Sequence, residues 1–213
     1  MEIEIEGHAL QLLPDGAAFD PAARTLFIAD LHFGKTTVFR AAGLALPDGP
    51  DATILSRLSR LVADTAAESL VILGDVFHAR TCGIERALTA WRDAHSQLHW
   101  RIVPGNHDRH IPWSEWLPGA EILCEGERAG SFSVAHFPPE KIGALTLCGH
   151  LHPGTTIGKA RERKLRLPCF WLRRGALVLP AFGEFTGLQI IEREADDRVW
   201  IAAAGKVVEI PRR

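Results

Sequence analysis

Short apolar runs in this 213-residue chain are repeatedly followed within three residues by Asp, Asn or His, and no other feature constrains the fold as strongly. The runs are residues 25–29, 71–73, 101–103, 131–135 and 144–148. Runs of this length predict buried strands. The polar residues that follow them are Asp30, His32, Asp75, His78, Asn106, His107, Asp108, His136, His150 and His152. Because ligands gather at the carboxyl ends of strands in α/β sheets, we expect these side chains to meet at one edge.

Helical periodicity separates the early strands, whereas the second half of the chain alternates strands and turns. Residues 51–65 place five apolar side chains on one face after Pro50, and a second helix is expected from Ile84 to about Ala94. The later strands are expected at residues 165–172, 176–179, 188–192, 199–203 and 207–210. An α/β half followed by a β-rich half predicts two sheets packed together and flanked by helices.

Length and composition fit one compact domain over residues 1–213, with 46% hydrophobic and 23% charged residues. The first ten residues, MEIEIEGHAL, alternate acidic and apolar side chains, unlike a signal peptide. No apolar segment is long enough to cross a bilayer, so we expect a cytoplasmic protein without a membrane partner. The net charge of −2 argues against whole-surface attraction to nucleic acid but leaves room for a local basic strip.

The residues after the five runs make a set of possible metal ligands. Each motif alone has another explanation, such as a capped turn or a surface histidine, but one metal centre explains all five together. Carboxylate, imidazole and amide donors without thiolate suit Mn²⁺, with Fe or Zn²⁺ as alternatives. The donors are too many for one ion, which predicts two metals about 3.5–4 Å apart that share a carboxylate.

Five ordered motifs resemble the calcineurin-like metallophosphoesterases. They are DLH (30–32), GDVFH (74–78), GNHD (105–108), His136 and GHLH (149–152). The resemblance implies a four-layer αββα sandwich of two mixed sheets flanked by helices. It also implies one metal held by Asp30, His32, Asp75 and His152, and a second held by Asp75, Asn106, His136 and His150, with Asp75 bridging. His107 corresponds to the catalytic histidine, which binds the scissile phosphate and assists the leaving group.

Four further stretches look like one bacterial subgroup, the ligase-associated DNA damage response endonucleases. They are DLHFGK (30–35), RAAGL (40–44), LPCFW (167–171) and LPAFGEFTG (179–187). This resemblance implies DNA, or a phosphodiester of DNA or nucleotides more generally, as substrate. It also implies functional association with a DNA ligase and a helicase. The sequence leaves open the oligomeric state and whether cleavage is endo- or exonucleolytic.

The implied mechanism is attack on phosphorus by a hydroxide bridging the two metals, with His107 as general acid. Asp108 either orients His107 or caps a turn. His78 has an outer-shell role near the leaving group, or only bonds a neighbour. The candidate cationic partners of the substrate phosphate are Lys35, Arg40, Arg80, Arg109 and His110.

A basic strip follows the GHLH motif, in residues 159–164 (KARERK) with Arg166, Arg173 and Arg174. It either tracks a nucleic-acid backbone or forms the solvated face of a hairpin. Trp113, Trp116 and Trp171 would stack on bases if exposed, although packing is the safer expectation.

Two other functions compete with a phosphodiesterase. A pyrophosphatase or phosphatase for nucleotide- or lipid-linked substrates would share the metal motifs, but residues 111–119 are too short for an apolar helical cap. A metal-binding scaffold without catalysis would have lost His107 or a ligand, and this sequence retains them all.

Overall fold

The computed structural model describes residues 1–212 apart from 46–48, 80–82, 141–142 and 159–163. Its first sheet has the strand order β1-β2-β3-β4-β5-β6-β7. These strands are β1 (Glu2–Ile5), β2 (His8–Leu12), β3 (Ala18–Asp20), β4 (Thr25–Ile28), β5 (Ser69–Leu73), β6 (His99–Val103) and β7 (Glu121–Ile122). The pairs from β1 to β4 are antiparallel, and those from β4 to β7 are parallel. The carboxyl ends of β4, β5 and β6 therefore lie at the same edge.

The second sheet has the order β14-β11-β12-β13-β10-β9-β8, with β15 pairing β12 and β16 pairing β15. Its strands are β8 (Arg128–Ala129), β9 (Phe132–Val134), β10 (Thr146–Cys148), β11 (Pro153–Ile157), β12 (Leu165–Arg173), β13 (Ala176–Val178), β14 (Gln189–Ile190), β15 (Arg198–Ala203) and β16 (Lys206–Glu209). Strands β9, β10 and β13 are parallel, whereas β12 runs antiparallel to β13. The predicted α/β class with two mixed sheets and flanking helices is confirmed.

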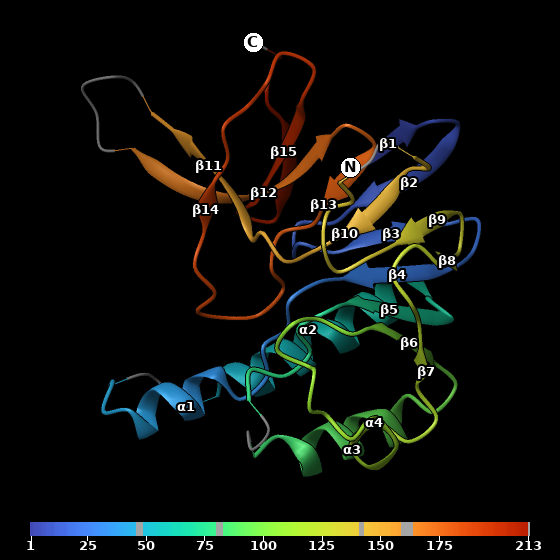
Figure 1. The fold of residues 1–213 in the computed structure, drawn as a ribbon, viewed down its shortest axis with the longest axis vertical. Helices are drawn as coiled ribbons and strands as arrows, with labels where there is room; N and C mark the ends of the chain where they lie inside the picture. The colour runs from blue at the N-terminus through green and yellow to red at the C-terminus, as the bar shows by residue number, and fades with distance from the viewer. Residues whose placement is uncertain (46–48, 80–82, 141–142, 159–163, 213) are drawn as a thin grey trace.

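The helices of the described chain are α1 (Lys35–Ala41), α2 (Pro50–Thr65), α3 (Glu85–Ala94) and α4 (Trp113–Trp116). In Figure 1, α2, α3 and α4 lie on the side of the first sheet that faces away from the second sheet, and α1 extends outward. Pro50 stands in the first turn of α2, where its missing N–H costs no hydrogen bond. None of the described helices has both the length and the apolar character needed to span a membrane.

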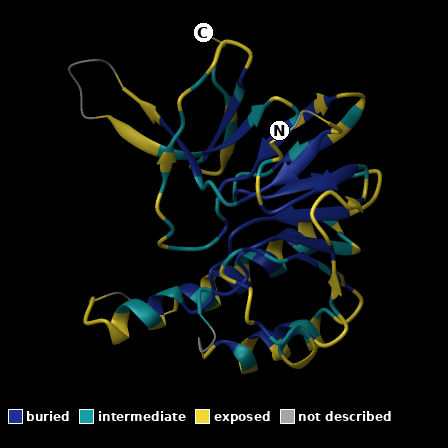
Figure 2. Ribbon diagram, in the orientation of Figure 1, coloured by how far each residue is buried: buried dark blue, intermediate teal, exposed yellow. Residues whose placement is uncertain are grey.

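Successive side chains of the central strands pack alternately into two separate core layers. On β4, Leu26 and Ile28 pack with the helices, whereas Phe27 packs between the two sheets. On β5, Leu70 and Val71 divide in the same way. Because both faces are covered, these strands are apolar at every position after the first, Thr25 or Ser69, rather than at every second one. The central strands form a buried band in Figure 2, while the far end of the β11–β12 hairpin is exposed.

Several elements were not predicted from the sequence, among them β7, β8, β11 and α4, and two further parts of the fold are informative. The first is the antiparallel start of the sheet, where Ile3 and Ile5 of β1 are buried and Glu2 and Glu4 are exposed. The alternation in MEIEIEGHAL is itself a strand signature, which we used only to exclude a signal peptide. The second is α1, which begins after Gly34 at a φ of 77° with no side-chain cap, so no start signal marks it.

Phe27→Ala tests the layer between the sheets. Phe27 is fully buried, with its ring edge-on to Phe132 at a centroid distance of 6.1 Å. Removing the ring should lower the free energy of unfolding by about 3–5 kcal/mol, measured by urea denaturation. The control Val208→Ala, at a position 56% exposed on β16, should change it by less than about 0.5 kcal/mol. A loss below about 1 kcal/mol for Phe27→Ala would contradict this packing.

Candidate metal centre

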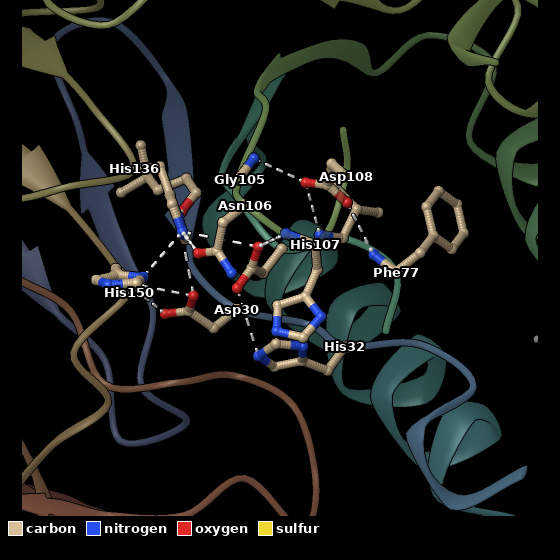
Figure 3. Close-up of polar contacts among 12 residues, drawn as sticks. Asp30, His32, Phe77, Gly105, Asn106, His107, Asp108, His136 and His150 are labelled. Carbon is tan, nitrogen blue, oxygen red and sulfur yellow. Dashed lines mark hydrogen bonds and ion pairs between the residues drawn. The ribbon is translucent and has the colours of Figure 1, made fainter. Parts of the chain in front are cut away.

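The polar segments after five strands converge at one edge, as expected. Two groups of side chains each bring their ligand atoms within 4.8 Å of one another. One group is Asp30, His32 and His152, and the other is Asp75, His136 and His150. Figure 3 shows Asp30, His136 and His150 directed toward a common centre, with the Asn106 side chain beside them. The chain therefore places donors from both sheets around one small volume.

Backbone hydrogen bonds continue past the ends of β4 and β5 and fix the first two segments. The Asp30 amide donates to the Gly74 carbonyl at 3.1 Å, and the His32 amide donates to the Asp75 carbonyl at 2.9 Å. One step further, Phe33 and Phe77 form a parallel bridge. Backbone hydrogen bonds thus join the loops after the two strands, as they join the strands, so the side chains of these loops have a rigid base.

Left-handed backbone is concentrated in these segments. Eleven non-glycine residues in the described ranges have a positive φ, and five of them are Asp30 (54°), His32 (48°), Asp75 (49°), His150 (70°) and His152 (45°). Such conformations are disfavoured for residues with a Cβ, and they persist only where the surroundings enforce them. Concentrated left-handed residues of this kind are typical of functional sites.

Two glycines leave room for the donor side chains. A Cβ on Gly74 would lie 2.0 Å from Nδ1 of His136, and one on Gly105 would lie 2.2 Å from Oδ1 of Asp75. Gly74 also has a φ of 84°, which favours glycine independently. The glycines of the GD and GN pairs are therefore required by the close approach of these two side chains.

The ring of His136 is oriented by partners on both sides. Its Nδ1 lies 3.0 Å from the Leu73 carbonyl oxygen, so this nitrogen carries the proton and donates to that oxygen. Nε2 then has the free lone pair, and it lies 3.0 Å from Oδ1 of Asn106 and 3.2 Å from Nδ1 of His150. The His136 amide donates to the Glu125 carboxylate at 3.1 Å. A histidine whose second nitrogen is held by a carbonyl is the usual arrangement of a metal ligand.

The donor set fits divalent cations. Nε2 of His32 and Nε2 of His152 are 3.3 Å apart, close to the roughly 3.3 Å between two nitrogens that each bind one tetrahedral ion at about 2.0–2.1 Å. Asp30 and Asp75 are 0% and 3% exposed, and their ion pairs within the described chain are all with histidines. Two buried carboxylates need positive charge nearby, and bound cations would supply it.

Burial keeps several of the histidines neutral, which is the form that binds metal. It lowers the pKa of His32 to about 2, with smaller contributions from Lys35 and the neighbouring histidines. Burial also lowers the pKa of His150, and the neighbouring His136 lowers it further. Burial lowers the pKa of His78 as well, and the positive charge of Lys35 adds to that lowering.

His107 lies beside the two groups and is more accessible than they are. It is exposed, and its backbone amide donates to Oδ1 of Asp75 at 2.9 Å. Its Nδ1 is 3.3 Å from the His78 carbonyl oxygen, and the two rings stack at a centroid distance of 5.2 Å. With His32 they form a third group of imidazoles. His78 is therefore next to His107, and it contacts that residue through both its ring and its backbone.

Asp108 caps the turn instead of orienting His107. It is 1% exposed, and its carboxylate accepts hydrogen bonds from the amides of Gly105 (2.9 Å), Val76 (3.2 Å) and Phe77 (3.2 Å). Figure 3 shows this carboxylate turned toward these amides. No hydrogen bond described for the chain joins it to the His107 ring, so the turn-capping alternative replaces the predicted catalytic role. Burial raises the pKa of Asp108, and the three amides oppose that shift.

The predicted phosphate-binding cations that the structure describes differ in their burial. Lys35 is half-buried and lies within electrostatic range of Asp30 and Asp75, whose charges oppose the lowering of its pKa by burial. Arg109 and His110 are exposed just after the Asp108 turn, and Arg40 is exposed on α1. Arg80 lies outside the described residues.

The basic strip is only partly described. Residues 159–163 fall outside the described ranges, and Arg166 is exposed. Arg173 and Arg174 both pair with Glu194. The tryptophans pack, as the safer expectation had it: Trp113 and Trp116 lie against the helical core, and the indole of Trp171 donates to Asp197 at 2.9 Å.

Sequence reasoning missed two residues at the centre. Glu125, which accepts the His136 amide, stands eleven positions earlier in a segment without a recognisable pattern. Phe137 contacts the rings of His136 and His150. Its position directly after a candidate ligand was the one available signal for it.

Comparisons with known proteins show what this chain is similar to in sequence and in structure. The sequence profile of the calcineurin-like phosphoesterases matches residues 23–175. The crystal structure of Pseudomonas putida nuclease MPE has 36% sequence identity and a TM-score of 0.82, covering 99% of this chain and 99% of that one. Yfce, a phosphoesterase from E. coli, has 13% identity and a TM-score of 0.44, covering 89% and 99%. No curated protein sequence matches this chain.

The pH dependence of stability in the metal-free protein tests the neutral state of His32. Because the folded pKa is about 2 and the unfolded one 6.5, the unfolded chain binds more protons below pH 6.5. Lowering the pH from 7 to 5.5 should therefore cost about 1 kcal/mol of unfolding free energy through this residue. His32→Asn should lack that increment, whereas His99→Asn, at an exposed position, should keep it. Identical pH profiles for wild type and His32→Asn would contradict the burial of a neutral imidazole.

Proposed function

This chain belongs to the calcineurin-like phosphoesterases, and from that premise we propose that it hydrolyses phosphodiesters in DNA or nucleotides with two divalent metal ions. Members of the family use a binuclear metal centre. The observation that carries the proposal is the pair of ligand groups at one sheet edge, with Asp75 between them and His107 alongside. Similarity to a nuclease over nearly the full chain supports the substrate class.

We assign the ligands by these groups. One ion would be held by Asp30, His32, Asp75 and His152, and the other by Asp75, Asn106, His136 and His150. Oδ2 of Asp75 is 3.8 Å from Nε2 of His32, and its Oδ1 is 3.7 Å from Nε2 of His136. Because the two oxygens of one carboxylate face the two groups, Asp75 is suited to bridge them.

The ions, when bound, supply positive charge for the phosphoryl oxygens and lower the pKa of the attacking water. The chain adds the proton for the leaving group. In the doubly protonated ring of His107, Nδ1 donates to the His78 carbonyl and Nε2 holds the proton that the departing oxygen receives, which leaves a neutral ring protonated at Nδ1. Its exposure suits this role, since the substrate must reach it. In this account His78 is a positioning residue that fixes the His107 ring.

Lys35 would supply a further positive charge at the centre. Its half-buried ammonium lies within range of both carboxylates and can contact a phosphate bound between them. Arg40, Arg80, Arg109 and His110 remain proposed partners of more distant phosphates. We propose Mn²⁺ as the ion because of the donor set, and association with a DNA ligase and a helicase because of the subgroup resemblance. A cytoplasmic location stays a prediction.

Neither a lipid-linked substrate nor a non-catalytic scaffold is favoured by a feature of the described residues. A lipid-linked substrate needs an apolar cap, and α4 is a single helical turn of four residues. Its two tryptophans, Trp113 and Trp116, pack against the core of the chain itself. A non-catalytic scaffold has no need of an accessible histidine held against Asp75, and His107 is held there.

Activity of His107→Ala tests this proposal. The wild type with Mn²⁺ should cleave both bis-p-nitrophenyl phosphate and a dinucleotide. The variant should lose about 10²- to 10⁴-fold in kcat on the dinucleotide, whose leaving alkoxide no longer receives a proton, and clearly less on the nitrophenyl ester, whose phenolate leaves unprotonated. Metal content, measured by elemental analysis, should stay at the wild-type level. His99→Ala, which truncates a 58% exposed histidine at the other end of β6, should retain full activity.

Two outcomes would contradict the proposal. Wild-type rates in His107→Ala would remove that residue from catalysis. A substrate panel of single-stranded DNA, duplex DNA, cyclic dinucleotides and phosphomonoesters tests the substrate class separately. Preference for monoesters would overturn the phosphodiester assignment while leaving the metal centre intact.

A further inference from the structure

A large aromatic side chain is exposed directly beside the proposed metal ligands. Phe137 is 42% exposed, although it follows a buried strand and a fully buried histidine. Its ring centroid is 4.4 Å from that of His150 and 4.7 Å from that of His136. Both contacts are tilted or edge-on, at 57° and 75°, so neither imidazole stacks flat on the phenyl ring. The ring is anchored at the centre while much of its surface faces solvent.

Phe137 forms one wall of a hollow of about 410 Å³. Pro138, Pro139 and Thr146 line the same hollow, together with the carboxylate-bearing Glu125. Among the described residues that line it there is no Lys or Arg, and the Glu125 carboxylate accepts a hydrogen bond from the His136 amide. From these residues a phosphate would meet a negative charge and no cation. A flat, uncharged ring would meet an aromatic wall and two prolines.

The wall is also stiff. The prolines fix two consecutive φ angles, and Pro138 restricts the backbone of Phe137 as the residue before a proline. The amide of His136, one residue earlier, is tied to Glu125. A side chain held in this way loses little entropy when a ligand stacks on it.

We propose that Phe137 is a specificity-determining residue that stacks on the base of the nucleotide adjoining the cleaved phosphate. The inference rests on the proposed function, because it places the scissile phosphate at His136 and His150 and the neighbouring base in the hollow. Every base presents a π-face, so the contact selects nucleotides over other phosphodiesters without selecting a sequence.

Three diesters with the same leaving group test this contact, all assayed with Mn²⁺. They are the p-nitrophenyl esters of thymidine 5′-phosphate and thymidine 3′-phosphate, and methyl p-nitrophenyl phosphate, which has no base. Phe137→Ala should lower kcat/KM roughly tenfold or more for at least one thymidine ester, mainly through KM. The loss for the methyl ester should be clearly smaller. Phe137→Trp should restore the preference, whereas Phe137→Leu, which keeps apolar packing against the histidines, should not.

The outcomes separate the possible failures. Equal losses on all three esters together with a lower metal content would mean that Phe137 only packs against the ligands, which overturns the inference. Unchanged ratios of kcat/KM in Phe137→Ala, with an active wild type, overturn it as well and leave the proposed function standing. A wild type that cleaves none of the three overturns both. Val208→Ala serves as the control for loss of an exposed apolar side chain.

Discussion

The rest of the structure depends on two carboxylates, Asp30 and Asp75, that are buried at the ends of neighbouring parallel strands. A buried negative charge is costly unless positive charge or hydrogen bonds compensate it. Backbone amides do part of this: His150 donates to Asp30 at 2.9 Å, and His107 donates to Asp75 at the same distance. Other neighbours include Lys35 and several imidazoles, four of which complete the two ligand groups. Cations bound between them would complete the compensation.

The local backbone follows from that requirement. To turn several short side chains inward at one edge, the chain adopts left-handed angles at five of the donor residues and places glycines where their side chains approach. The strain is supported by the layers below: helices cover one face of β4 and β5, and the second sheet covers the other. Residues on the outer side of the donors, among them His107, Lys35 and Phe137, are more accessible and are free to meet a substrate.

The sequence was most informative about the buried strands and helices, where apolar residues have the single role of packing in the core. The strands at 71–73 and 101–103 and the helix at 51–65 were found from apolar patterns, because burial on one or two faces leaves a direct periodic trace. The convergence of the donor side chains could be predicted because parallel strands such as β4, β5 and β6 end at the same edge of the sheet. Asp108 could not be assigned, since an aspartate that accepts three amides and one that orients a histidine look alike in sequence. Glu125 was missed because only tertiary folding brings it to the His136 amide.

Anomalous diffraction from crystals grown with Mn²⁺ tests the central claim most directly. The account predicts two manganese peaks at this edge of the sheets. One should lie among Asp30, His32 and His152, the other among Asn106, His136 and His150, and Asp75 should contact both. Side chains that point apart with no ion between them, or a single ion bound elsewhere on the chain, would contradict it.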